Sequence, residues 1–255
     1  MRLRDKVAVV TGGASGIGKA IVLGFAREGA SVVVDYVGDD APAGAVVGEI
    51  LDFGGKAFAV SADVSKENEV AELVAHTVKH FGALDIWVNN AGIEHKLPFL
   101  DTPLDLWNKV IAVNLTGAWL CSQFAAKQMV KQKRGGRIVN ISSVHEELAM
   151  PTNAPYCASK GGIRMLMRTI AIELASHGIT VNDVCPGAVD TPMDAKLKSE
   201  RGKYEKLLSE IPLGRMAKPE EIAELCVYLA SDAGAYVTGA SYVIDGGMTK
   251  QSGSL

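Results

Sequence analysis

The segment "NISSVHEELAMPTNAPYCASKGG" (140–162) places a phenol and an ammonium group four residues apart, at Tyr156 and Lys160, with Ser142 and Ser143 upstream. An isolated phenol has a pKa of about 10, so Tyr156 alone is a poor base near neutral pH. If the segment is helical, residues four apart share one face, and the charge of Lys160 favours the phenolate. The spacing therefore indicates a general acid/base pair, with an ordinary surface pair on a helix as the alternative.

A glycine-rich stretch, "TGGASGIGKA" (11–20), follows a short apolar run and precedes a helical pattern. Glycines at such a turn let backbone N–H groups approach a pyrophosphate at the positive end of a helix. A merely tight strand-to-helix turn is one alternative. Another is the nucleoside-triphosphate loop, but Ala20 follows Lys19 where that pattern needs Ser or Thr for magnesium. We therefore predict a dinucleotide site.

The next apolar run, "SVVVDY" (31–36), carries Asp35, which lies 17 residues after Gly18. An acidic residue at about this distance accepts hydrogen bonds from the adenine ribose hydroxyls of NAD. A 2′-phosphate would meet Asp35, Asp39 and Asp40, with no Lys or Arg in "DYVGDDA" to offset the repulsion. The predicted cofactor is NAD, with NADP as the second choice. A loop carboxylate that points to solvent is the alternative for Asp35.

Short β-branched apolar runs alternate with longer helical patterns along the whole chain. Continuous apolar runs are typical of parallel strands buried on both faces, and such alternation indicates one sheet covered by helices. We predict an α/β fold: a single-domain, doubly wound, Rossmann-type parallel sheet of seven strands with helices on both faces, spanning 1–255. The predicted strands are 7–11, 31–36, 57–61, 84–90, 137–142, 180–185 and 241–244, and the predicted helices are 16–28, 40–53, 66–81, 103–133, 154–176 and 218–231.

Composition and charge argue against several classes of partner. The chain has 255 residues, 48% of them hydrophobic, and a formal charge of -3, so it offers no concentrated basic face for nucleic acid. No stretch approaches the roughly 20 apolar residues of a membrane span, and no signal-peptide core is present. Four cysteines lack metal or disulfide spacing. His76 and His80 have no third ligand at a matching spacing, so no metal is predicted and a cytoplasmic location is expected.

These motifs together resemble the short-chain dehydrogenase/reductase family over essentially the whole chain. Besides the glycine loop and the Ser, Tyr and Lys above, the matching stretches are "ADVS" (62–65), "NNAG" (89–92), Asn114 in a long helix, and "PGAVDT" (186–191). The resemblance implies metal-free hydride transfer between a secondary alcohol or hemiacetal carbon and the nicotinamide ring.

The resemblance also implies a role for each matched residue. Ser143 would hold the substrate oxygen, Tyr156 would exchange its proton, and Lys160 would bind the nicotinamide ribose and lower the pKa of Tyr156. Asn114 would keep a water in place for a proton relay through Lys160. The cofactor would contact Gly12, Ser15, Gly16, Ile17, Gly18, Asp35, Asp63, Val64, Asn90, Ala91, Gly92, Tyr156, Lys160, Pro186, Gly187, Val189 and Thr191.

Within the family, "NISSVHEEL", "NNAGIEHKLPF" and "DGGMTKQSGSL" are most similar to bacterial glucose 1-dehydrogenases. Glu94 and His145 would then contact sugar hydroxyls; a loop ion-pair partner and a backbone-bonded histidine are the alternatives. Two departures are that "LAMPTNAP" (148–155) lacks aromatic residues and that Asp35 replaces an uncharged residue. A 3-oxoacyl carrier-protein reductase shares the catalytic residues but usually uses NADPH and carries a basic residue where His177 stands.

Three further expectations concern regulation, mobility and assembly. A catalytically idle dinucleotide-binding regulator is the non-enzymatic alternative, although the complete catalytic set argues against it. The charged stretch 194–210 is predicted to be a substrate lid near 190–212, with a solvated surface helix as the alternative. The family resemblance implies a homotetramer that packs 103–133, 154–176 and the C-terminal strand against other copies.

Overall fold

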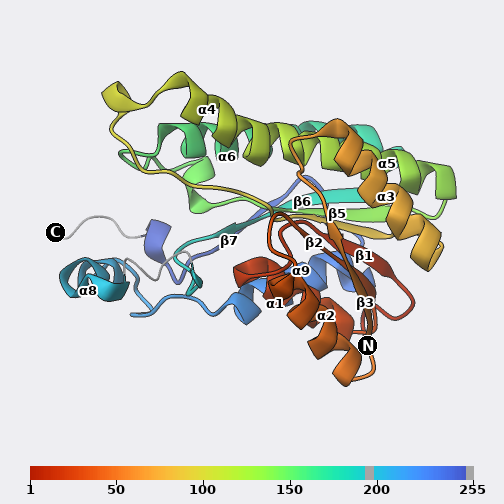
Figure 1. Ribbon diagram of the computed structural model, residues 1–255. Coiled ribbons are helices and arrows are strands. Elements are labelled where there is room, and N and C mark those ends of the chain that lie inside the picture. The colour runs from red at the N-terminus through yellow and green to blue at the C-terminus, as the bar shows by residue number, and fades with distance from the viewer. Residues whose placement is uncertain (193–197, 251–255) are drawn as a thin grey trace.

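The computed structural model describes residues 1–192 and 198–250 (Figure 1). Within these residues, seven strands form one parallel sheet in the order β3-β2-β1-β4-β5-β6-β7. The predicted doubly wound sheet is confirmed. The strands are β1 (Val7–Val10), β2 (Ser31–Tyr36), β3 (Lys56–Ser61), β4 (Ile86–Asn89), β5 (Gly136–Ile141), β6 (Ile179–Pro186) and β7 (Ser241–Ile244).

Helices cover both faces of the sheet, because alternate side chains of each buried strand point to opposite sides. Val32 and Val34 pack in the core beneath one helical layer, whereas Val33 packs in the core beneath the other. The first layer contains α1 (Gly16–Arg27), α2 (Ala41–Asp52) and α9 (Pro219–Ala230). The second contains α3 (Glu67–Phe81), α4 (Leu104–Ile111), α5 (Gly117–Gln132) and α6 (Ala154–Leu174).

The helix predicted over 103–133 is divided, which corrects the sequence-based prediction. A π-helical turn, η2 (Ala112–Thr116), separates α4 from α5 and contains Asn114. A π turn adds a residue to the helical repeat and often occurs at functional sites. Asn114 therefore lies in this turn rather than in a regular α-helix.

The segment predicted as a lid is only partly described. Residues 193–197 lie outside the described part of the chain. The following helix, α8 (Arg201–Ser209), has no buried residue among those described. Figure 1 shows α8 standing away from the body of the sheet. These observations agree with the surface-helix alternative, and the lid stays a prediction.

Short 3-10 helices complete the described elements: η1 (Phe99–Asp101), η3 (Val144–Glu146), η4 (Ala175–His177), η6 (Asp232–Gly234) and η7 (Met248–Lys250). All strands are parallel, so their carboxyl ends meet at one edge of the sheet. In open α/β sheets, ligands bind outside this edge. The loops after β1, β4, β5 and β6 all emerge there, and they carry the motifs singled out above.

Candidate active site

Hydrogen bonds join the glycine loop to the "NNAG" loop. The Thr11 hydroxyl oxygen accepts from the backbone N–H groups of Asn90, at 2.9 Å, and Ala91, at 3.0 Å. In return, the Asn90 side-chain amide donates to the carbonyl oxygens of Thr11 and Gly12, at 2.8 and 3.1 Å. These four bonds hold the loops after β1 and β4 together, although the sequence analysis gave Thr11 no binding role.

The glycine loop leaves room for a ligand because its glycines are packed backbone to backbone. A Cβ on Gly18 would collide with the Gly12 carbonyl oxygen, and Gly12 has a φ of +61°. Ser15 precedes α1, and the first turn of α1 contains no acidic residue. Free N–H groups at the start of a helix bind phosphate. Gly12, Ser15, Gly16, Ile17 and Gly18 thus fit the pyrophosphate of a dinucleotide.

The loop after β6 approaches the same helix start. Pro186 ends β6, the Gly187 N–H donates to the Ile244 carbonyl at 3.0 Å, and Val189 is buried. The methyl group of Thr191 lies 3.5 Å from where a Cβ on Gly16 would stand. The "PGAVDT" segment therefore borders the glycine loop, as a segment that contacts the same ligand must.

Asp35 differs from the position predicted for it. Its side chain is 1% exposed, and one carboxylate oxygen accepts from the Gly12 N–H at 3.1 Å. Alternation along β2 places Asp35 on the same face as Val33, inside the protein. The solvent-pointing alternative is therefore wrong. The Asp35 carboxylate is also not exposed to a bound ribose in this conformation, because it is buried and hydrogen-bonds the backbone of the glycine loop at Gly12. Burial raises the pKa of Asp35 to about 8.

Asp63 and Val64 follow β3 and border the site from the other side. The Asp63 carboxylate accepts from the Ser65 hydroxyl at 2.7 Å and from the Ser65 N–H at 3.0 Å. These bonds, the hydroxyl first, keep the pKa of Asp63 below its usual value. Val64 is buried and lies so close to Gly117 that a Cβ there would stand 2.8 Å from its methyl group.

Ser143, Tyr156 and Lys160 come together beyond the end of β5. The Ser143 hydroxyl accepts from the His145 N–H at 3.1 Å and hydrogen-bonds the Tyr156 phenol. The Lys160 ammonium lies 5.4 Å from the centre of the Tyr156 ring and donates to the Ile141 carbonyl at 2.8 Å. Ser142 is buried beside them, with a hydroxyl that has no hydrogen-bond partner among the described residues.

Burial dominates the electrostatics of this group. It raises the pKa of Tyr156 to about 12, although the hydrogen bond from Ser143 acts in the opposite direction. It lowers the pKa of Lys160 to about 8, and nearby carboxylates oppose that shift. Without a ligand, Tyr156 is therefore a neutral phenol near pH 7, and further positive charge is needed before it can act as a base.

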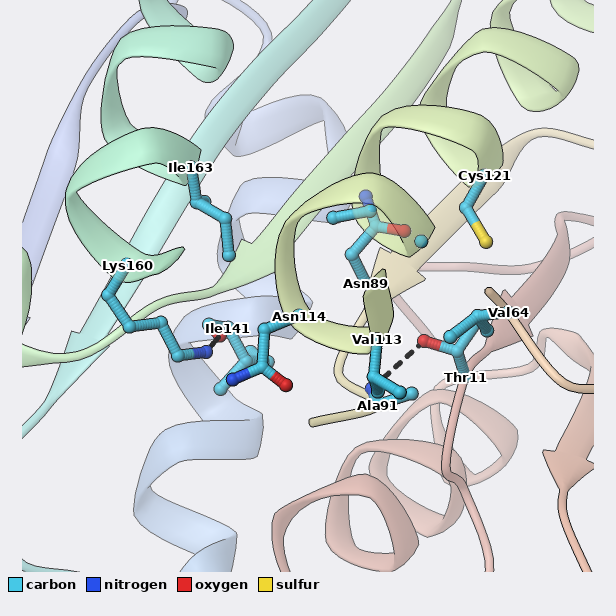
Figure 2. Close-up of a pocket in the computed structure, with 12 residues that line it drawn as sticks. Thr11, Val64, Asn89, Ala91, Val113, Asn114, Cys121, Ile141, Lys160 and Ile163 are labelled. Atoms are coloured by element: carbon cyan, nitrogen blue, oxygen red, sulfur yellow. Dashed lines mark hydrogen bonds between the residues drawn. The ribbon is translucent and has the colours of Figure 1, made fainter. Parts of the chain in front are cut away.

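Asn114 connects the "NNAG" loop to α6. Its carbonyl oxygen accepts from the Ile93 N–H at 2.9 Å, and its amide donates to the Ile93 carbonyl at 3.0 Å and to the Ser159 hydroxyl at 3.2 Å. Gly92 lies close by, since a Cβ on it would be 3.5 Å from the Asn114 oxygen. Figure 2 shows Asn114 and Lys160 pointing toward one another in a shared pocket.

Glu94 and His145 both lie near Tyr156. The charge of Glu94 raises the pKa of Tyr156, and the His145 ring is 6.4 Å from the Tyr156 ring, edge to face. Each also makes the contact of its alternative: Glu94 pairs with Lys96 at 3.1 Å, and His145 Nδ1 lies 3.1 Å from the Leu148 carbonyl. The structure therefore places both Glu94 and His145 near Tyr156.

Three buried residues at the site were missed by the sequence analysis. Asn153 is fully buried and donates to Glu94 at 2.7 Å, which fixes that carboxylate. Ser159 donates to the Tyr156 carbonyl at 2.7 Å and so ties Asn114 to α6. Asp183 is a fully buried acid in β6. Only Asp183 gave a signal in the sequence, as a charge inside the apolar run "TVNDVC".

No described helix is long and apolar enough to cross a membrane. A search of the described residues also finds no group of three or more side chains able to hold a metal ion. His80 instead packs against Phe58, with ring centroids 4.3 Å apart.

The doubly wound sheet, the glycine loop and the Ser, Tyr and Lys group define a dinucleotide-dependent oxidoreductase. A family model described as "Enoyl-(Acyl carrier protein) reductase" matches residues 12–249. The chain belongs to the short-chain dehydrogenase/reductase family.

Individual relatives differ in the substrates their names give. The chain is 42% identical to glucose 1-dehydrogenase 2 of Bacillus subtilis, over 97% of this chain and 96% of that protein. It is 44% identical to a 3-oxoacyl-[acyl-carrier-protein] reductase of Synechocystis, over 96% of this chain and 98% of that protein. The crystal structure of a short-chain type dehydrogenase/reductase from Mycobacterium marinum superposes with a TM-score of 0.92 at 38% identity, and covers 98% of this chain and 97% of that one.

Proposed function

We propose that the protein oxidises a secondary alcohol or a sugar hemiacetal with NAD, in the manner of a glucose 1-dehydrogenase. The observation that carries the proposal is the meeting of Ser143, Tyr156 and Lys160 beside the glycine loop. A phenol, a hydroxyl that bonds it and a buried ammonium supply the groups needed to remove a proton from an alcohol.

The chain's own residues then have the following roles. The Ser143 hydroxyl binds the substrate oxygen and orients it toward Tyr156. The Tyr156 phenolate accepts the hydroxyl proton, and the positive charge of Lys160 favours that phenolate. Asn114, held by Ile93 and Ser159, orders the pocket beside Lys160. NAD, when bound, supplies the nicotinamide carbon that accepts the hydride.

The preference for NAD rests on the residues after β2. Asp39 and Asp40 are exposed beyond the end of this strand, and the sequence from Asp35 to Ala41 contains no Lys or Arg. A 2′-phosphate there would face negative charge without a cation to offset it. Because Asp35 is buried, the repulsion would come from Asp39 and Asp40, with no Lys or Arg between Asp35 and Ala41 to offset it.

A sugar substrate is supported by the polar groups that border Tyr156. Asn153 holds the Glu94 carboxylate at a fixed place, and His145 lies on the same side. Carboxylate and imidazole groups bind hydroxyls well. The Bacillus subtilis relative, named glucose 1-dehydrogenase 2, agrees with this choice.

A second enzymatic function, reduction of a 3-oxoacyl thioester on a carrier protein, is favoured by the relative from Synechocystis. The same Ser143, Tyr156 and Lys160 would act in the reverse direction, with Tyr156 as the acid. An idle dinucleotide-binding regulator would need no such group, so it is the weakest of the three proposals.

We also infer a homotetramer, as the family resemblance implies. Large apolar side chains are exposed on the outer helices, among them Leu104 of α4 and Met165 and Ile172 of α6, and Tyr236 precedes β7. Apolar groups at this density on a helical layer are typical of an interface. Size-exclusion chromatography with light scattering should return four copies; a monomer would contradict the inference.

Initial rates decide between these functions. Nicotinamide reduction is measured with D-glucose and a panel of sugars and secondary alcohols, in parallel with NAD and NADP. Turnover of a sugar with NAD is expected. Silence on every sugar, together with oxidation of NADPH by a 3-oxoacyl thioester, would replace the proposal with the reductase. Binding of the dinucleotide without turnover of any substrate would support the regulator.

A further inference from the structure

A row of hydrogen-bonded polar side chains crosses three strands beneath α6. The Asn89 amide donates to the Asn140 oxygen at 2.7 Å, and the Asn140 amide donates to the Asp183 carboxylate at 2.7 Å. The three residues are register partners, since Asn89 pairs with Asn140 and Asn140 with Asp183 in the parallel sheet. The row therefore places Asp183 at a fixed point on the sheet face.

That face is the one covered by the catalytic helix. Val181, two residues before Asp183, packs in the same core as Met167 of α6. Asp183 itself is 0% exposed, and only one of its carboxylate oxygens has a hydrogen-bond partner among the described residues. An ionisable group buried in this way costs free energy unless a nearby charge compensates it.

The charged neighbours of Asp183 come from the elements packed against it. Lys160 and Arg164 extend from α6, and Glu146 lies in η3. Cys185 is the other titratable group on β6, and burial raises the pKa of its thiol. Burial lowers the pKa of Lys160, and the charges of Asp183 and Glu146 oppose this shift. Arg164 pairs with Glu146 at 3.6 Å and also with the exposed Glu147.

We propose that Asp183 is a positioning residue for the reaction: its carboxylate, held by Asn140 beneath α6, keeps Lys160 in the ammonium form that supports the Tyr156 phenolate. The lysine donates to the Ile141 carbonyl, directly after Asn140 in β5. Both charges are therefore anchored to adjacent residues of one rigid strand, and their separation is fixed. Arg164 is already engaged by Glu146 and Glu147, which leaves Lys160 as the cation that Asp183 serves.

Ionisation links the two groups. Burial raises the pKa of Asp183 to about 8 and lowers the pKa of Lys160 to about 8. As the pH rises through this region, Asp183 becomes a carboxylate and opposes loss of the Lys160 proton. Asp183 would in this way extend the pH range in which Lys160 is charged. Oxidation is faster at the alkaline end of that range because more of Tyr156 is then a phenolate.

The test is the pH profile of Asp183→Asn. The carboxamide keeps the acceptor for Asn140 but removes the charge. In Asp183→Asn, the alkaline limb of the pH profile of kcat/KM, measured with an alcohol that the wild type oxidises, should shift to lower pH by ~1 pH unit. The matched control is Asp85→Asn. Asp85 lies directly before β4, is 7% exposed, and its carboxylate accepts from the Val7 N–H. It should leave the limb in place.

A second readout separates this proposal from the proposed function. The Lys160 side-chain ¹³Cε resonance, assigned by its loss in Lys160→Met, should titrate at lower pH in Asp183→Asn even if no alcohol is turned over. If Asp183→Asn does not fold, Glu146→Gln should shift the same titration in the same direction by a smaller amount. A titration and a pH limb that stay within ~0.2 pH unit of wild type would overturn the proposal, even if the rate itself falls.

Discussion

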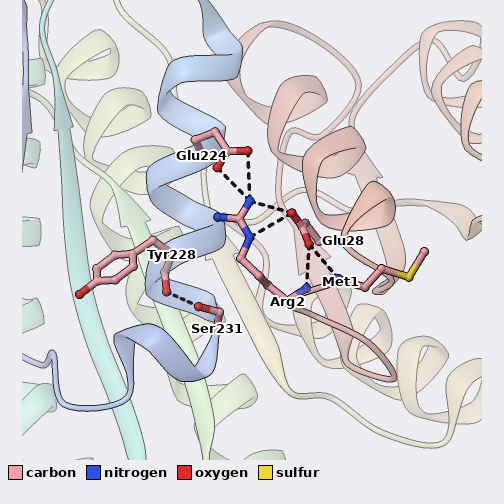
Figure 3. Close-up of polar contacts among 6 residues, drawn as sticks. All are labelled: Met1, Arg2, Glu28, Glu224, Tyr228 and Ser231. Carbon is pink, nitrogen blue, oxygen red and sulfur yellow. Dashed lines mark hydrogen bonds and ion pairs between the residues drawn. The ribbon is translucent and has the colours of Figure 1, made fainter.

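Two clusters of charged and polar side chains show how burial changes what such groups do. One lies beneath α6 and contains Asn140, Asp183 and Lys160. The other lies at the surface, where Arg2 donates to Glu28 at the end of α1 and to Glu224 of α9 (Figure 3). Both contain a cation within reach of carboxylates, yet one is enclosed by the sheet and the other is open to solvent.

The pKa values of the carboxylates in the two clusters are shifted in opposite directions. Desolvation raises the pKa of Asp183, whereas the Arg2 hydrogen bonds lower the pKa of Glu28. The buried acid therefore costs folding free energy and is useful only for what it does to its neighbours. The surface pair fastens the N-terminus to two helices, and solvent screens most of its energy. We therefore expect substitutions in the buried cluster to change the reaction, and substitutions in the surface cluster to change stability alone.

Tyr156→Phe should produce the largest effect. It removes the one exchangeable proton, so turnover should fall by about 10³-fold or more, while NAD affinity stays within about twofold. Initial rates and calorimetric binding measure the two quantities. Tyr228→Phe is the matched control, since Tyr228 in α9 lies beside the surface cluster and should keep the wild-type rate. Retention of a tenth of the rate in Tyr156→Phe would refute its role.

Asn140→Ala should cause the largest loss of stability. It removes the side-chain donor to the buried Asp183 carboxylate and leaves the Asn89 amide with Ser122 as its remaining side-chain acceptor, at a cost of roughly 2–4 kcal/mol in the free energy of unfolding. Urea denaturation measures it. A loss below about 1 kcal/mol would show that the buried row is no more important than a surface contact.

Asp35→Asn should change how stability depends on pH. The folded-state pKa of Asp35, about 8, lies above its unfolded value of roughly 3.9, so the folded protein binds the extra proton in that window. Stability from this group is present at low pH and is lost as the pH rises toward 8. The carboxamide removes this slope, so the variant should gain on wild type from pH 5 to 8 by up to about 1 kcal/mol per pH unit. Thermal unfolding at several pH values measures the gain, and a constant difference would contradict the assignment.

Arg2→Ala should have the smallest effect, below about 1 kcal/mol in the free energy of unfolding, and smaller still in 1 M salt. The Arg2 and Glu224 side chains are 40% and 67% exposed, so solvent competes with their pairing. Urea denaturation at low and high salt measures the effect. A loss above about 2 kcal/mol that salt does not reduce would mean that the two clusters are not different in kind.

The fold was predictable from the sequence because its signals are local, and so was the proximity of Ser143, Tyr156 and Lys160, whose catalytic role stays a prediction. β2 and β7 have the predicted bounds, since apolar runs of this kind are distinct from helical patterns. The π turn at Asn114 was not predictable, because one added residue barely changes the helical period of 103–133. The inward position of Asp35 follows from alternation in β2, but only once Val33 is known to pack in the core on the α3 side of the sheet.

The hydrogen-bonded row of polar side chains beneath α6 could not be predicted from the sequence, for a different reason. Asn89, Asn140 and Asp183 are far apart in the chain and meet only through the register of three parallel strands. Nothing in the spacing of those residues states that register. The sequence does show that these residues are polar although they lie in buried strands. Polar residues at such positions mark places where a sequence departs from an apolar core.

Oxidation of an alcohol by hydride transfer, with Tyr156 as the base, is tested most directly with a labelled substrate. The alcohol identified by the rate panel carries deuterium on its oxidisable carbon, and the reduced nicotinamide is analysed by mass spectrometry. One deuterium per molecule of reduced cofactor is the expected result, with none formed by Tyr156→Phe. Oxidised product without deuterium in the cofactor, or unimpaired transfer by Tyr156→Phe, would contradict the claim.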